Sequence, residues 1–172
     1  RQRKTFGLAI AGLLCGALPL WAQDFPNRNI TMIVPFAAGG PIDATARLIS
    51  PLLADRLGKP VIVENIGGGG TTIGSLRVAR SSPDGHTLLL QNLALAATGT
   101  LYPKSGLDPA MSFTTISFLA SNALVLVGRK GLAPTTLDEM KAWMKSNRAK
   151  VAHPGVGTTG HLTSVVLANR LG

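Results

Sequence analysis

From residue 30 onward, short apolar runs alternate with segments whose apolar residues recur every three or four positions. The runs cover residues 30–35, 61–64 and 87–91, and a helical pattern that ends at Gly58 separates the first two. Strands that alternate with helices are typical of parallel α/β sheets, because each helix returns the chain across one face of the sheet. The sequence therefore predicts an α/β fold.

Local signals predict where the helices of these units begin and end. Asp43 is predicted to cap the first helix, Gly58 to end it, and Pro51 to kink or split it. A second helix is expected over residues 73–80, and the small-residue segment 93–101 is compatible with a third. The turn residues that separate the runs thus divide this half of the chain into three strand and helix units.

The following part of the chain carries different signals. Two apolar stretches, residues 116–120 and 123–127, are separated by two polar residues, and we expect them to cross from one lobe to another. Thr136 and Glu139 have the spacing of a capping box, in which each residue bonds the backbone of the other. The spacing predicts a helix directly after Thr136.

Three turns rich in small residues lie where strands are expected to end and helices to begin: residues 36–41, 67–72 and 155–160. The third follows a short strand expected at residues 150–152 and precedes a helix expected from His161. Glycines also make tight turns without any ligand. However, helix N-termini offer unpaired N–H groups and partial positive charge, and ligands of parallel sheets bind at the carboxyl ends of strands. Together the turns favour an anionic ligand.

The N-terminal segment has the layout of a secretory signal peptide. Basic residues precede an apolar run over residues 6–20, and polar residues 23–28 end this run too soon for a membrane-spanning helix. Residues 1–22 are therefore predicted to be a signal peptide, and the protein is predicted to be periplasmic. The only cysteine, Cys15, lies in this segment, so we expect no disulfide in the mature chain.

Several functional classes are disfavoured by the sequence. The formal net charge is +9, but most basic residues are scattered, whereas nucleic-acid-binding proteins usually gather them on one face. No nucleophile elbow, phosphate-binding P-loop or zinc-protease motif is found in the sequence. His86, His153 and His161 are too dispersed in the sequence to predict a metal site. We expect no catalytic residue, no metal and no cofactor, and hence no enzyme.

One enzymatic alternative stays open. Gly155, Gly157 and Gly160 match the G-x-G-x-x-G pattern, which would suit a dinucleotide-binding Rossmann-type enzyme. In such enzymes the pattern belongs to the first strand and helix unit, whereas here it comes late in the chain. The match is therefore a weak indication.

The segment PNRNITMIVPFAAGGPID, residues 26–43, strongly resembles the Bug family, the substrate-binding receptors of tripartite tricarboxylate transporters. Later segments agree with the family in the same order. They are residues 58–65, 82–85, 101–103 and 155–162. The resemblance implies a two-lobed periplasmic binding protein of the Venus-flytrap type, which closes its lobes about a small carboxylate. It also implies membrane permease subunits as partners, no nucleic-acid partner, and a monomer.

The resemblance also implies a division of the chain and a binding site. Residues 23–121 would form the first lobe, which is incomplete without a C-terminal return, and residues 122–172 would begin the second lobe. The chain is accordingly expected to be an N-terminal fragment. The ligand would lie between a first-lobe loop and a facing second-lobe turn. The expected ligand-binding residues are Phe36, Ala37, Ala38, Gly39, Gly40, Asp43, Gly157, Thr158, Thr159 and His161.

Overall fold

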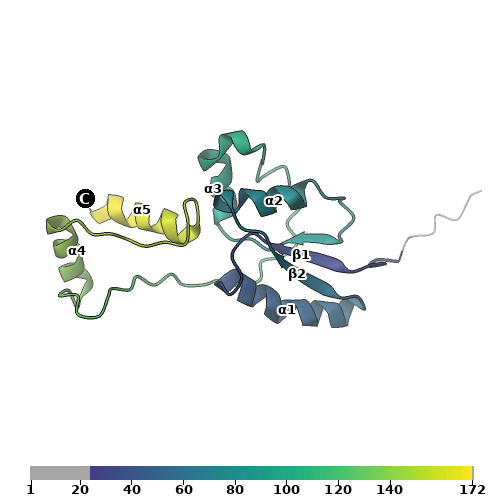
Figure 1. The fold of residues 1–172 in the computed structure, drawn as a ribbon, viewed down its shortest axis with the longest axis horizontal. Coiled ribbons are helices and arrows are strands. Elements are labelled where there is room, and N and C mark those ends of the chain that lie inside the picture. The colour runs from purple at the N-terminus through teal and green to yellow at the C-terminus, as the bar shows by residue number, and fades with distance from the viewer. Residues whose placement is uncertain (1–23, 172) are drawn as a thin grey trace, which may run out of the picture.

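The computed structural model describes residues 24–171 and confirms the predicted α/β fold (Figure 1). The signal peptide predicted at residues 1–22 lies outside the described residues. The strands β1 (Ile30–Val34), β2 (Val61–Asn65) and β3 (Thr87–Leu89) form one parallel sheet in the order β2-β1-β3. The three predicted strands therefore form, and β3 ends two residues earlier than expected.

The central strand β1 carries the core. Ile30, Met32, Ile33 and Val34 are almost fully buried, as expected for a parallel strand with helices on both faces. Helix α1 (Pro41–Leu57) covers one face and α2 (Thr72–Ala79) the other (Figure 1). On the α1 side, Met32 and Val34 pack against Ala46, and partly buried residues surround them.

The ends of α1 differ in part from the prediction. The helix begins at Pro41 with Gly40 as its N-cap, so the prediction that Asp43 caps it was wrong. Proline suits the first helical position because its ring fixes φ near the helical value and its missing N–H is not needed there. Pro51 does not split the helix, since it lies on the exposed side, where water can satisfy the carbonyl that loses its partner. Gly58 ends the helix in the left-handed conformation, as predicted.

Shorter elements complete the part of the chain around the sheet. The helix α3 (Ala94–Leu101) forms where a third helix was expected, and two single 3-10 turns, η1 (Gly69–Thr71) and η2 (Pro103–Ser105), lie on either side of it in sequence. We refer to β1, β2 and β3 with α1, α2 and α3 as the sheet unit.

The chain leaves the sheet unit through a long passage without helix or strand. Residues 113–129 are irregular, and the apolar stretches 116–120 and 123–127 are exposed to solvent. Phe118, for example, is 82% exposed. This passage leads to helix α4 (Leu137–Ser146), as Figure 1 shows. The capping box predicted from Thr136 and Glu139 is present at its start.

The strand expected at residues 150–152 does not form. A strand needs a neighbour whose N–H and C=O groups pair with its own, and no described residue pairs with this segment. Helix α5 (Thr159–Leu171) begins two residues before the expected start at His161. Among residues 24–171, no helix has both the length and the apolar character needed to cross a membrane.

Candidate functional site

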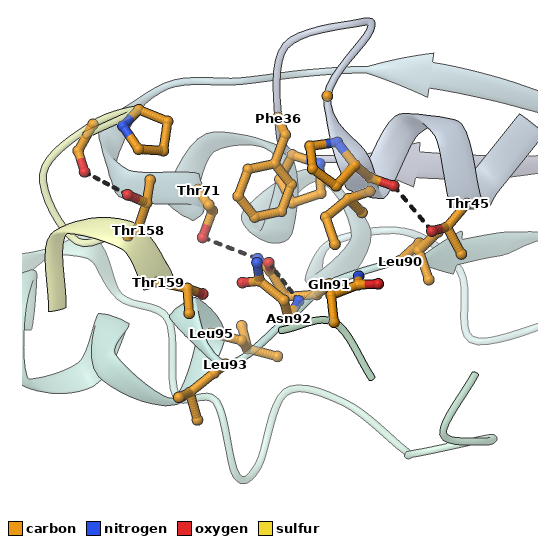
Figure 2. Close-up of a pocket in the computed structure, with 18 of the residues that line it drawn as sticks. Phe36, Thr45, Thr71, Leu90, Gln91, Asn92, Leu93, Leu95, Thr158 and Thr159 are labelled. Carbon is orange, nitrogen blue, oxygen red and sulfur yellow. Dashed lines mark hydrogen bonds between the residues drawn. The ribbon is translucent and has the colours of Figure 1, made fainter. Parts of the chain in front are cut away.

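The candidate site lies at the carboxyl ends of β1 and β3. In the order β2-β1-β3 the chain turns in opposite directions from β1, and ligands of such sheets bind where this reversal leaves a crevice. Figure 2 shows Phe36 after β1, Gln91 after β3, and Thr158 and Thr159 at the start of α5, around one pocket. The structure thus brings residues of both predicted halves to the same pocket, whereas the predicted residues Asp43, Gly157 and His161 do not line it.

The pocket is part of a much larger open space of about 3000 Å³. Sites for small molecules usually measure about 300–1,000 Å³. The space is larger because it extends along the exposed passage and past α4. The chemistry of the lining residues, and not the volume, therefore locates the site.

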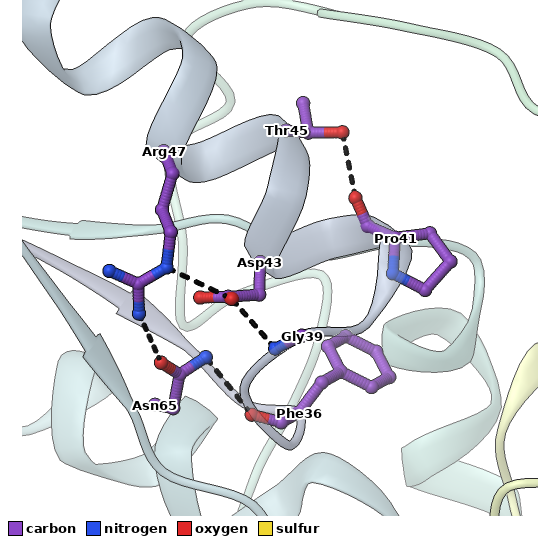
Figure 3. Close-up of polar contacts among 7 residues, drawn as sticks. All are labelled: Phe36, Gly39, Pro41, Asp43, Thr45, Arg47 and Asn65. Carbon is purple, nitrogen blue, oxygen red and sulfur yellow. Dashed lines mark hydrogen bonds and ion pairs between the residues drawn. The ribbon is translucent and has the colours of Figure 1, made fainter.

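Asp43 braces the loop at residues 36–40 from behind (Figure 3). Its Oδ2 atom accepts hydrogen bonds from the Gly39 N–H at 2.8 Å and from Arg47 Nε at 3.0 Å. The residue is 2% exposed. The hydrogen bond from Arg47, followed by that from Gly39, lowers the pKa of Asp43 to about 2. These contacts make Asp43 a charged support of the loop, and a direct ligand contact by its carboxylate stays a prediction.

The same network continues to β2. Arg47 Nη2 donates to Asn65 Oδ1 at 3.2 Å, and Asn65 Nδ2 donates to the Phe36 carbonyl at 3.3 Å (Figure 3). The sequence prediction did not include Arg47 or Asn65. The spacing of four residues between Asp43 and Arg47 on one helix face was the signal for the first contact. The contact between Asn65 and Phe36 depends on β1 and β2 lying side by side.

The loop leaves particular amide groups free. Gly39 has φ +81° and its N–H is occupied by Asp43, while Gly40 serves as the N-cap of α1. The N–H groups of Ala37 and Ala38 have no acceptor among residues 24–171. These two amides, next to the positive end of α1, are the donors that the loop can offer to an anion.

The facing turn before α5 is held by its own contacts. The Gly157 N–H donates to His161 Nδ1 at 3.2 Å, and Thr158 Oγ1 donates to the Gly155 carbonyl at 2.6 Å. Thr159 Oγ1 is buried and has no hydrogen-bond partner among the described residues. Buried hydroxyl groups without a partner are uncommon in native structures. Among the predicted residues of this turn, Thr159 therefore has a hydroxyl whose hydrogen-bonding capacity is unused by the described residues, whereas His161 and Thr158 shape the turn.

Two of the histidines lie together, contrary to the expectation that all three are dispersed. The rings of His153 and His161 have their centroids 4.7 Å apart, because the turn folds back on itself. His153 Nδ1 accepts a hydrogen bond from the Gly155 N–H at 3.2 Å, so both rings bind backbone amides of the turn. No group of three potential metal-ligating side chains is found among residues 24–171.

Gln91 was missed by the sequence prediction, and Thr71 was included only as part of the turn at residues 67–72, not among the expected ligand-binding residues. Gln91 Nε2 donates to Thr71 Oγ1 at 2.9 Å and contacts Ser75 Oγ at 3.3 Å. Thr71 has φ +84°, which is uncommon for a β-branched residue and costs free energy. Thr71 is almost fully buried and lines the pocket (Figure 2). The sequence signal that could have placed Gln91 in the site was its position directly after an apolar strand.

The dinucleotide alternative lacks its structural context. A Rossmann fingerprint connects a strand to a helix, with its glycines at the turn between them. The segment 155–160 precedes α5, but the described residues directly before it, 147–154, form no strand. The glycine pattern alone therefore does not support a dinucleotide site.

Solved periplasmic binding proteins share this fold. The structure of the periplasmic binding protein BugD is 36% identical, with a TM-score of 0.73 over 86% of this chain and 50% of BugD. MatC from Rhodopseudomonas palustris with bound malate is 38% identical, with a TM-score of 0.79 over 86% of this chain and 51% of MatC. A second R. palustris protein, with adipate, is 28% identical, with a TM-score of 0.68 over 84% of this chain and 49% of that protein. These similarities define the class as periplasmic binding proteins.

The sequence comparison gives the family. Residues 45–172 match the tripartite tricarboxylate transporter family receptor, and the chain belongs to this family. The resemblance to the Bug family noted from the sequence is thereby confirmed. The chain spans about half the length of the curated relatives it matches.

Proposed function

We propose that this protein binds a small carboxylate between the loop at residues 36–40 and the turn at residues 157–159. The observation that carries the proposal is the presence of unpaired donors on both sides: the amides of Ala37 and Ala38, and the buried hydroxyl of Thr159. Hydrogen bonds to a charged acceptor are stronger than those between neutral groups. The malate and adipate bound in two similar proteins support a ligand of this class.

The electrostatics of the site favour an anion. The N-termini of α1 and α5 both lie at the pocket, and each carries partial positive charge. The positive charge of Arg47, 3.0 Å from the Asp43 carboxylate, offsets the repulsion that this carboxylate would exert on an anionic ligand. Carboxylate oxygens of a ligand between the loop at residues 36–40 and the turn at residues 157–159 would accept hydrogen bonds directly or through water.

The biological setting completes the proposal. Family membership supports a receptor that delivers its ligand to membrane permease subunits and performs no catalysis itself. The protein would act in the periplasm as a monomer after removal of residues 1–22. Residues 23–121 and 122–172 would belong to separate lobes, and the irregular passage between them is long enough to allow the lobes to move relative to each other.

Thr159→Val provides the sharpest test, because valine keeps the shape of threonine and replaces only the hydroxyl with a methyl group. Titration calorimetry of the full-length protein with malate and adipate should show about 10-fold to 100-fold weaker binding, the loss expected for one hydrogen bond to a charged group. The melting temperature without carboxylate should not fall, since this hydroxyl has no partner to lose among the described residues.

Thr158→Val is the matched control. Its hydroxyl bonds the Gly155 carbonyl at 2.6 Å, so this variant should lose thermal stability. Unchanged carboxylate affinity in folded Thr159→Val would refute the proposed site. Stabilisation of the parent protein by NAD, but by no carboxylate in a panel of mono-, di- and tricarboxylates, would refute the proposed function.

A further inference from the structure

Tyr102 connects the sheet unit to the turn before α5. Its backbone is fixed at both sides: its N–H donates to the Thr98 carbonyl at 2.8 Å, and its carbonyl accepts from the Ser105 N–H at 2.9 Å. From this position, between α3 and η2, its hydroxyl donates to the Val156 carbonyl at 3.1 Å. The bond joins residues that are 54 positions apart in the sequence.

The ring of Tyr102 fills the space between two glycines. A Cβ atom at Gly70 would overlap the ring, and a Cβ atom at Gly157 would lie 3.1 Å from its Cε2 atom. Both glycines have positive φ, +61° and +82°. The ring therefore contacts the glycine-rich loop after β2 on one side and the predicted ligand turn on the other; a side chain at Gly70 would clash with it, and one at Gly157 would crowd it.

We propose that Tyr102 is a positioning residue that sets the place of residues 156–159 relative to the sheet unit. This inference rests on the proposed function, since it concerns how the donors of Thr159 are held opposite those of Ala37 and Ala38. The hydroxyl bond is made to Val156, three residues before Thr159, and the ring supports Gly157 in between. Binding sites need such support, because a displacement of a donor by about 1 Å weakens its contacts with the ligand.

Tyr102→Phe removes the hydroxyl and keeps the ring, so it isolates the bond to Val156. In hydrogen exchange of the full-length protein, amides of residues 155–162 should exchange roughly fivefold faster, the change expected for loss of one hydrogen bond. Amides of α4 should be unaffected, because the hydroxyl of Tyr102 bonds Val156 and not α4. Stopped-flow measurements with malate and adipate should show a similar increase in the dissociation rate of whichever carboxylate binds.

A pair of glycine variants tests the contact of the ring. Gly70→Ala and Gly58→Ala both place alanine at positive φ, +61° and +69°, but Gly58 has no atom within 4 Å of its Cβ position. Both variants carry the backbone strain, and only Gly70→Ala displaces the ring. Hydrogen exchange in residues 155–162 should therefore become faster in Gly70→Ala and not in the control variant. In a protein that also carries Tyr102→Leu, the difference in exchange between the two glycine variants should become smaller.

The outcomes separate the inference from the proposed function. If Tyr102→Phe leaves the exchange of residues 155–162 unchanged, the positioning role is wrong, whether or not Gly70→Ala folds. If exchange rises but carboxylate dissociation does not, Tyr102 only stabilises the turn and the positioning role is again wrong. If the parent protein binds no carboxylate, the proposed function fails and this inference fails with it, even where the exchange effect is seen.

Discussion

Gly39 and Asp43 show how single residues shape the candidate site. Asp43 was predicted both to cap α1 and to bind the ligand, and the structure uses its carboxylate to hold the N–H of Gly39. This contact orients the loop so that its neighbouring amides, those of Ala37 and Ala38, stay free. A buried carboxylate beside the proposed anion site is thus explained by its support of backbone donors, with Arg47 balancing its charge.

Gly39→Ala should weaken carboxylate binding through the backbone. Its φ of +81° is strained for alanine, although no atom lies within 4 Å of the Cβ position. Relief of that strain, about 1 kcal/mol, would move the adjacent amides. Gly58→Ala is a close control, because Gly58 has φ +69° and equally open space but lies at the far end of α1. Calorimetry should show reduced affinity only for Gly39→Ala; equal affinities of the two folded variants would contradict this role of the loop.

At the scale of elements, α4 depends on its capping box. Thr136 Oγ1 accepts from the Glu139 N–H at 3.3 Å, and Glu139 Oε2 accepts from the N–H groups of Thr135 at 2.7 Å and Thr136 at 3.3 Å. The bond from the Thr135 N–H, first among several, lowers the pKa of Glu139. No residue of α4 is buried, so local contacts must supply much of its stability.

Thr136→Ala should therefore destabilise α4 by about 1 kcal/mol, the usual cost of losing an N-cap side chain. Hydrogen exchange of amides in residues 137–146 measures the change, with roughly fivefold faster exchange expected. Thr115→Ala serves as the control, because Thr115 is exposed and its side chain has no hydrogen bond to a described residue. Identical exchange of α4 in both variants would show that the box does not stabilise the helix.

At the scale of the whole molecule, two carboxylates at opposite ends of the sheet link stability to pH. Asp43 follows the carboxyl end of β1, and Asp84 precedes the amino end of β3. The pKa of Asp84 is also lowered to about 2, first by the hydrogen bond from the His86 N–H and then by Arg28. Both groups stay charged in the folded protein at pH values where the unfolded chain takes up protons.

The free energy of unfolding should accordingly be insensitive to these groups above about pH 5, where they are charged in both states, and it should fall as the pH drops from there toward 2. Denaturant unfolding at a series of pH values measures this. The double variant Asp43→Asn, Asp84→Asn should be less stable at neutral pH and should lose less stability on acidification. Asp55→Asn, at an exposed position of α1 where the carboxylate has no ion pair with a described residue, should behave as the parent does. If the double variant lost as much stability on acidification as the parent does, Asp43 and Asp84 would not be the source of the acid response.

The sequence by itself determined the α/β fold, three strands, the Gly58 stop of α1, the capping box of α4, and the family. These features depend on local information, because the side-chain period of a strand or helix and the chemistry of a turn are set within a few residues. The strand predicted at residues 150–152 failed for the complementary reason, since pairing requires a neighbour that no local pattern supplies.

Only the tertiary structure decided the partners of the polar groups. Asn65 reaches the Phe36 carbonyl, Gln91 holds Thr71, and Tyr102 reaches Val156, each across a long separation in the sequence. A buried polar group must find a partner, but the path of the whole chain determines which group lies within 3 Å or so of it. The sequence therefore specified which turns could bind an anion, and the fold decided which of their donors are free to do so.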